Sequence, residues 1–226
     1  MIMDEAKDIS KTIIYKQLRR SIIMGHRRPG ERLNIEALAQ FFNTSVTPVR
    51  DALQMLDQEE LITIKPRSGY FVARMTLKEL HDILELRKIL ELASIERAAL
   101  RISEEQIYQL RNVHAGYTGD DDESYDRYTD ENRRFHFLLA ETSGNHELAT
   151  TLGHVHDRLA RFMVIRHAGK TQSINHARIV DALEKHDITS ARQAITDEID
   201  TTHASILDHV MQEEASSWHL SAPRSS

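Results

Sequence analysis

The stretch from Asn43 to Leu56, NTSVTPVRDALQML, constrains the fold more than any other part of the sequence. Short hydroxyl residues open it and can cap a helix, and Pro48 suits a first helical turn because its missing N–H would be unpaired there anyway. Apolar residues then recur at spacings of three and four, which predicts one buried stripe with Arg50 on another face. We therefore expect a helix whose polar start is free to make contacts. The stripe consists of Val49, Ala52, Leu53 and Leu56.

The flanking segments complete a small fold of known type. Residues 35–42, IEALAQFF, predict a short helix joined to the first by a tight turn, as in a helix-turn-helix. Residues 61–74 hold two apolar runs separated by a turn, which predicts a β-hairpin with Lys65 and Arg67 at its tip. Residues 10–25 predict a helix that braces this unit. A helix-turn-helix followed by a basic hairpin is a winged helix.

Charge divides the chain into two parts. The 226 residues carry a net charge of −6, yet residues 1–75 hold 12 lysines and arginines against 9 acids. The remainder is acidic, so we expect contact with phosphates only in the first part. Charge that simply varies along the chain is the alternative explanation.

The sequence gives no sign of a membrane protein or of an exported one. No apolar run approaches the roughly 20 residues that cross a bilayer, and residues 1–10 contain acids where a signal peptide has an apolar core. There is no cysteine, hence no disulfide and no thiolate metal site. We expect a cytoplasmic protein with no membrane partner.

The rest of the chain predicts a helical domain. Thr76, with Glu79 three positions later, forms a capping-box pattern, and helical apolar spacing continues to Leu100. Later breaks leave five more helical segments. The expected protein is mainly α, with an N-terminal winged helix-turn-helix and small β-hairpin over residues 1–75, an antiparallel bundle of six or seven helices over 76–212, and a flexible tail over 213–226.

Two of the 13 histidines stand where core residues are expected. His136 shares a helical face with Asn132, and His176 shares one with Val180, whereas most others, including His114, are expected on the surface. A buried imidazole needs a hydrogen-bond partner or a metal ion. A hydrogen-bonded core histidine is the common outcome for either residue alone. Two inward-facing histidines on different helices leave a metal site equally open.

The motifs PGERL, TPVRDAL and PRSGYFV carry a family resemblance. They run through residues 10–74, which resemble the GntR family of bacterial transcription regulators. The sequence departs from the family at Val46, where arginine is usual. The resemblance implies DNA contact by the recognition helix and the wing, through Ser45, Thr47, Arg50, Arg67 and Gly69.

A second resemblance covers residues 77–210, through the motifs NRRFHFLL, SGN and HARIVDALEKHD. This part is similar to the helical, FCD-like ligand-binding domain of the FadR-type branch of GntR regulators. In that branch an aspartate or asparagine and three histidines can hold a divalent ion, often zinc or nickel, which helps to receive a small carboxylate. The matching positions imply a metal site formed by Asn132, His136, His176 and Glu198.

Two of the implied roles have alternatives. The family usually has histidine where Glu198 stands, but a carboxylate oxygen also suits zinc, nickel or manganese. His203 is the alternative candidate for the last metal ligand. Arg87 matches an arginine that often faces the cavity, and it could pair with an effector carboxylate. It could equally form a surface ion pair with Glu91 one turn on.

These features together predict a DNA-binding transcription regulator, a repressor that binds its operator as a homodimer and responds to a small organic acid. The alternative is a metal-dependent hydrolase or lyase that acts on a small acid. The sequence contains no HExxH helix, GxSxG turn or glycine-rich phosphate loop, so we do not expect an enzyme. A helical adaptor without a DNA role would leave the basic hairpin unexplained.

Overall fold

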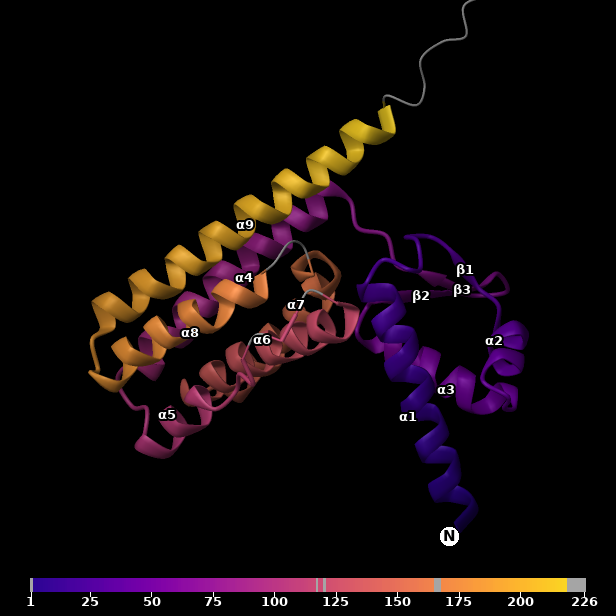
Figure 1. The fold of residues 1–226 in the computed structure, drawn as a ribbon, viewed down its shortest axis with the longest axis horizontal. Coiled ribbons are helices and arrows are strands. Elements are labelled where there is room, and N and C mark those ends of the chain that lie inside the picture. Colours follow the sequence, from indigo (N-terminus) through magenta and orange to yellow (C-terminus); the bar gives the residue numbers. More distant parts are fainter. Residues whose placement is uncertain (1, 117, 120, 165–167, 219–226) are drawn as a thin grey trace, which may run out of the picture.

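The computed structural model describes residues 2–116, 118, 119, 121–164 and 168–218, and Figure 1 shows that they form two parts. The first part contains α1 (Ile2–Ile23), β1 (Arg32–Leu33), α2 (Ile35–Phe41), α3 (Val46–Gln58), β2 (Ile62–Lys65) and β3 (Gly69–Val72). The second contains α4 (Leu77–Ala98), α5 (Glu104–Arg111), α6 (Asp122–Thr142), α7 (His146–Met163), α8 (Ala168–Glu184) and α9 (Ile188–Trp218). The predicted architecture, a mainly α protein with a winged helix ahead of a helical domain, is confirmed.

The first domain is held together by the stripe that the sequence predicted on α3. Val49, Leu53 and Leu56 are fully buried, and they pack with Leu18 of α1 and Val72 of β3 in one apolar cluster. Burying each such side chain contributes roughly 1.5–3 kcal/mol, so α1 and the sheet are fixed on α3. The polar start of α3 is thereby left facing outward.

Three local details of this domain differ from the sequence expectation. α1 begins at Ile2, well before residue 10, because the helical pattern extends into the acidic start of the chain. Ser45 occupies the N-cap position of α3, but its side chain makes no capping hydrogen bond. The hairpin has a third partner, since β1 pairs antiparallel with β3 to give the strand order β1-β3-β2. Two residues are too short a strand to show a pattern in sequence.

The second domain is a bundle in which α4 packs against α6, α7 and α9, while α8 packs against α9 (Figure 1). The described part of this domain contains six helices, in agreement with the sequence. Thr76 and Glu79 form the predicted capping box at the start of α4. α9 continues to Trp218, so residues 213–218 are helical and do not form the start of a tail, whereas residues 219–226 lie outside the described part.

None of the described helices is both long and apolar enough to cross a bilayer. α1 of the first domain packs against α7 of the second, so the two domains touch directly.

Candidate DNA interface and metal centre

The start of α3 presents the residues that the sequence assigned to DNA. Ser45, Thr47 and Arg50 are all exposed. Arg50 has no ion-pair partner among the described residues, so its guanidinium is available to a phosphate or a base edge. Val46, which stands where the family usually has arginine, is partly buried against the domain core and adds to packing instead.

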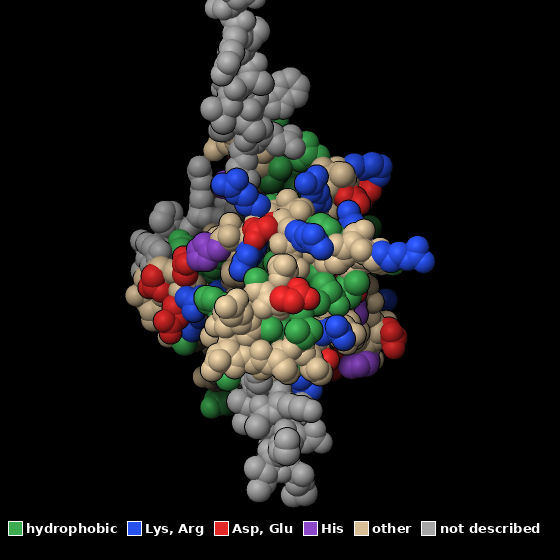
Figure 2. Space-filling model, turned by 90° about the vertical axis from the view of Figure 1, so that its right-hand side faces the viewer, with side chains coloured by type: hydrophobic (Ala, Val, Ile, Leu, Met, Phe, Trp, Pro, Cys, Tyr) green, Lys and Arg blue, Asp and Glu red, His purple; other side chains and the backbone are tan. Residues whose placement is uncertain are grey.

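The wing places a second cationic group beside this helix. Arg67 is exposed in the turn between β2 and β3, with a left-handed φ of 61°. Gly69 begins β3 opposite Lys65 and has a φ of 111°, a conformation that only glycine adopts without strain. In Figure 2, which views the molecule from the side of this domain, lysine and arginine side chains spread over the upper part of the face.

Inside the second domain, six side chains from five helices meet in what we call the buried cluster. Each of them is buried, although each can carry a charge, and such groups are almost never buried without partners. The cluster consists of Arg87 and Glu91 on α4, His136 on α6, His156 on α7, His176 on α8 and Glu198 on α9.

Glu198 lies where the two histidines singled out in the sequence converge. Its Oε1 is 3.2 Å from Nε2 of His136 and 3.5 Å from Nε2 of His176. Oε2 of Glu198 and Nε2 of His176 have no hydrogen-bond partner among the described residues. Two imidazole nitrogens and a carboxylate with spare lone pairs therefore point at one small volume.

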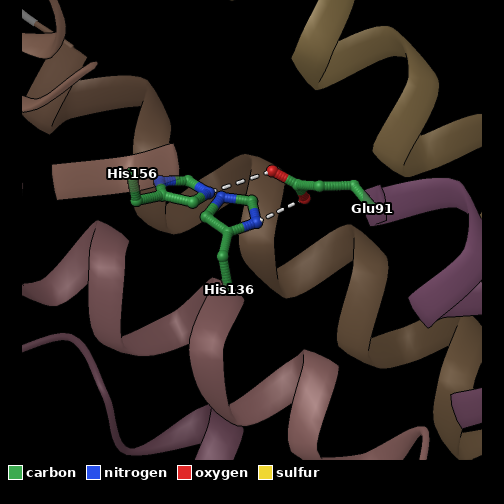
Figure 3. A group of neighbouring side chains, drawn as sticks. All are labelled: Glu91, His136 and His156. Carbon is green, nitrogen blue, oxygen red and sulfur yellow. Dashed lines mark hydrogen bonds and ion pairs between the residues drawn. The ribbon is translucent and has the colours of Figure 1, made fainter. Parts of the chain in front are cut away.

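Glu91 supports the other side of His136, as Figure 3 shows. Its Oε2 is 2.6 Å from Nδ1 of His136, and its Oε1 is 3.1 Å from Nε2 of His156. Arg87 donates from Nε to the same Oε1 over 2.7 Å. The surface alternative for Arg87 and Glu91 is therefore wrong, although the pair itself forms, because their exposed fractions are 0% and 1%.

The protonation of the cluster follows from these contacts. Burial alone would lower the pKa of His136, but Glu91 and Glu198 outweigh it and raise the pKa to about 9. Burial lowers the pKa of His156 to about 3 and that of His176 to about 4. Burial opposes ionisation of Glu91 and Glu198, yet protonated His136 holds both pKa values below the usual range, and Arg87 adds to the effect at Glu91. At neutral pH the two carboxylates are thus balanced by Arg87 and protonated His136.

The residues fit a divalent ion between His136, His176 and Glu198, whose ligand atoms lie within 4.8 Å of one another. The far nitrogen of His136 faces Glu91, the carboxylate partner that metal-bound histidines usually have. The far nitrogen of His176 is also held, since its Nδ1 lies 2.7 Å from Nε2 of His114. A second group, Glu91, His136 and His156, satisfies the same distance. It fits less well, because Arg87 already occupies Oε1 of Glu91.

The remaining predicted ligands lie at the edge of this centre. Asn132 is buried and lines a cavity together with Glu198, but no described hydrogen bond joins it to His136 or His176. His203 is half-buried, and Nε2 of this residue has no hydrogen-bond partner among the described residues. Among the described residues, His203 belongs to neither group of converging ligand atoms. Of the two candidates, Glu198 and His203, it is Glu198 that faces His136 and His176.

Sequence reasoning missed three supporting residues. His156 continues the buried stripe of Leu152, Val155 and Leu159 on α7, a signal of the kind that identified His176. Glu91 looked like an ordinary surface acid. His114, expected on the surface, is mostly buried in a loop where no periodicity could reveal its contact with His176.

An exposed recognition helix with a basic wing, joined to a helical domain with a polar buried cluster, is the architecture of a DNA-binding regulator. Comparison with known families agrees: residues 11–72 match "Bacterial regulatory proteins, gntR family", and residues 82–201 match the FCD domain. The chain belongs to the GntR family of transcription regulators and carries an FCD domain.

Individual relatives support the same assignment. The chain is 30% identical to an uncharacterized HTH-type transcriptional regulator, YdhC of Bacillus subtilis, over 88% of this chain and 91% of that protein. It is 28% identical to the HTH-type transcriptional repressor RspR of Escherichia coli, over 91% of each. The solved structure of E. coli McbR/YncC shares the fold, with a TM-score of 0.71 at 18% identity over 89% of this chain and 98% of that one. These relatives are named as transcription regulators and not as enzymes, so the hydrolase or lyase alternative is not supported.

The buried histidines predict how stability depends on pH. Below about pH 6.5 the unfolded chain protonates His156 and His176, whereas the folded state keeps them neutral, so the unfolded state binds more protons and stability falls with pH. At about pH 5.5 each histidine should cost roughly 1 kcal/mol of unfolding free energy. Urea unfolding of metal-free protein across this range measures the loss. Burial also lowers the pKa of half-buried His203 to about 4, so this residue adds to the loss and His156→Gln should remove somewhat less than half of it. The exposed His81→Gln control should leave the pH dependence unchanged; the same pH dependence in both variants would contradict the assignment.

Proposed function

We propose that this chain is a repressor whose affinity for its operator is set by a small carboxylate that binds at a divalent ion in the FCD domain. The observation that carries the proposal is the convergence of His136, His176 and Glu198 beside a cavity that Glu198 and Asn132 line. RspR and GlaR of E. coli, both named repressors, are relatives of this chain, which supports repression over activation.

The donor set favours zinc, nickel or manganese. Imidazole nitrogen suits zinc and nickel, and the carboxylate oxygen of Glu198 extends the choice to manganese. The amide oxygen of Asn132 supplies a further neutral donor at the cavity side. Bound there, the ion would supply a concentrated positive charge that attracts an anion. Arg87, whose Nη2 is 3.7 Å from Oε1 of Glu198, would hold the carboxylates in position from behind.

The charges of the cluster indicate how an effector would be selected. With a divalent ion in place and the proton on His136 released, the ion and Arg87 together carry three positive charges against two carboxylates. One positive charge is left uncompensated, which a single carboxylate would neutralise. No lysine, arginine or histidine is among the described residues that line the cavity, so the ion would be the main attraction for an acid.

The cavity itself selects for size and polarity. Its volume is about 130 Å³, well below the roughly 300 Å³ at which pockets for drug-sized ligands begin. Amides and hydroxyls dominate its polar lining, which suits an acid that carries hydroxyl groups of its own. These polar side chains include Asn132, Gln172, Asn175, Thr201, Thr202 and Ser205.

On DNA we propose a homodimer that acts in the cytoplasm. Two copies of α3 would read half-sites about one turn of the duplex apart, with Ser45, Thr47 and Arg50 at the groove and Arg67 at its edge. Gly69 would let the wing backbone approach the phosphates. Leu86 and Ile89 expose apolar surface on one face of α4, which supports a contact with a second copy in the FCD domain.

Removal of the Arg50 side chain should abolish specific binding to DNA. Arg50→Ala loses a charge-assisted contact, so affinity for a duplex selected by the wild-type protein from a random library should fall at least about tenfold. Fluorescence anisotropy at fixed salt measures the change. Lys185→Ala, which removes an exposed cation on the FCD domain, is the matched control. Unchanged DNA affinity of the Arg50→Ala variant would contradict the assignment of α3 to the DNA interface.

Substitutions should show which of Glu198 and His203 binds the metal ion. Glu198→Ala should weaken zinc or nickel binding by about 100-fold, because it removes an anionic ligand, whereas His203→Gln should leave it within about twofold. Isothermal titration of chelator-treated protein gives both affinities, and elemental analysis of protein never exposed to chelator gives the stoichiometry. A protein without stoichiometric metal, whose melting temperature does not rise with zinc, nickel or manganese, would contradict the site.

Effector binding should require the ion. In a thermal-shift screen of lactate, glycerate, gluconate and succinate, a hydroxylated monocarboxylate should raise the melting temperature of nickel-loaded protein by a few degrees. The shift should vanish with chelator, because the only charged side chain among the described residues that line the cavity is then Glu198, which repels an acid. Glycerol and glyceramide serve as uncharged controls. A shift of equal size without the ion would show that the acid binds elsewhere.

A further inference from the structure

An ion network joins the two domains, and it is centred on the buried Arg19 of α1. Its guanidinium is 3.1 Å from Glu59 at the end of α3, 3.0 Å from Asp130 on α6 and 3.9 Å from Asp157 on α7. Arg19 is only 7% exposed. Because an unpaired charge at such a site is costly, these contacts fix where the first domain sits on the second.

Asp157 is shared between the two domains. This buried carboxylate pairs with both Nε and Nη2 of Arg133 on α6, the latter at 2.9 Å, while Arg19 of the first domain approaches its Oδ1. The tight pair with Arg133 and the longer approach of Arg19 compete for one carboxylate. A small shift of α7 relative to α6 would therefore change how strongly Asp157 holds α1.

The same two helices carry residues of the buried cluster close to this ion network. His156, next to Asp157 in sequence, contacts Glu91, and His136, three positions after Arg133, contacts both Glu91 and Glu198. Thus α6 and α7 form the wall between the cluster and α1, which lies against them in Figure 1. On α6 and on α7, a residue of the ion network therefore lies close in sequence to a residue of the buried cluster.

We propose that Asp157 couples the metal centre to the DNA-binding domain by exchanging its carboxylate between Arg133 and Arg19. This inference rests on the proposed function, since it needs an ion or an effector at the cluster. Ligation would draw His136 towards His176 and Glu198, and Glu91 would pass the movement to His156 on α7. The displaced Asp157 then binds Arg19 more strongly or less strongly, and the placement of α3 changes with it. An effector can act only through such a difference between two arrangements.

The test measures coupling separately from binding. Nickel serves as the probe, and the coupling factor is the ratio of the Kd values for the selected duplex with and without saturating nickel. The wild-type factor should be about tenfold, within the usual range for linked sites. Asp157→Asn keeps the shape of the side chain but removes its charge, so nickel affinity should be retained while the factor falls to within about twofold of unity.

Two further variants show whether the coupling depends on the link between Asp157 and Arg19. Arg158→Gln removes the neighbouring pair between α7 and Glu60, which also joins the domains but is more exposed, and it should keep the wild-type factor. Arg19→Gln tests the same link from the first domain if Asp157→Asn folds poorly, and it should lose coupling too. A wild-type factor in both Asp157→Asn and Arg19→Gln, or no wild-type coupling despite nickel binding, would overturn the inference. Absence of nickel binding would overturn the proposed metal site, and the inference with it.

Discussion

The carboxylate of Glu91 is the contact on which the interior of the FCD domain depends. It is buried among Arg87, His136 and His156, so it ties α4 to α6 through the charge on His136 and to α7 through a hydrogen bond with neutral His156. A buried anion must keep its partners, and each of these partners is therefore held in one orientation. For His136 that orientation sends Nε2 towards Glu198 and His176. The donor set is thus arranged by the protein before any ion arrives.

The winged helix was predictable because its determinants are local. Hydroxyls, a proline and an apolar stripe over Asn43–Leu56 predict α3 without knowledge of the rest of the chain, and the capping box at Thr76 likewise predicts the start of α4. The centre was predictable only in part. Periodicity identifies His136 and His176 as inward-facing, and family resemblance adds Glu198. Nothing local shows that Glu91 faces a histidine 45 positions away, since an acid four residues after an arginine is usually a surface pair.

The chain divides its tasks between parts of opposite charge. The basic first domain has an exposed helix start and wing, and its one departure from the family pattern, Val46, packs towards the core where a cation would reach outward. The acidic second domain exposes most of its charged groups but buries six ionisable side chains in one cluster. Arg19 belongs to the first domain but has carboxylate partners in both, so the boundary is itself electrostatic. Apolar contacts hold each domain together, and ion pairs fix the orientation of the first domain on the second.

The proton on His136 has a consequence of its own. Because this proton and Arg87 neutralise the two glutamates, the buried cluster is electrically neutral in the absence of any ion, and we expect the domain to fold without one. A dication that enters must first evict the proton. If the proposed site holds a divalent ion, its occupancy would follow the ratio of free cation to hydrogen ion in the surrounding water, so that alkaline, cation-rich surroundings would fill the site and acidic ones would empty it.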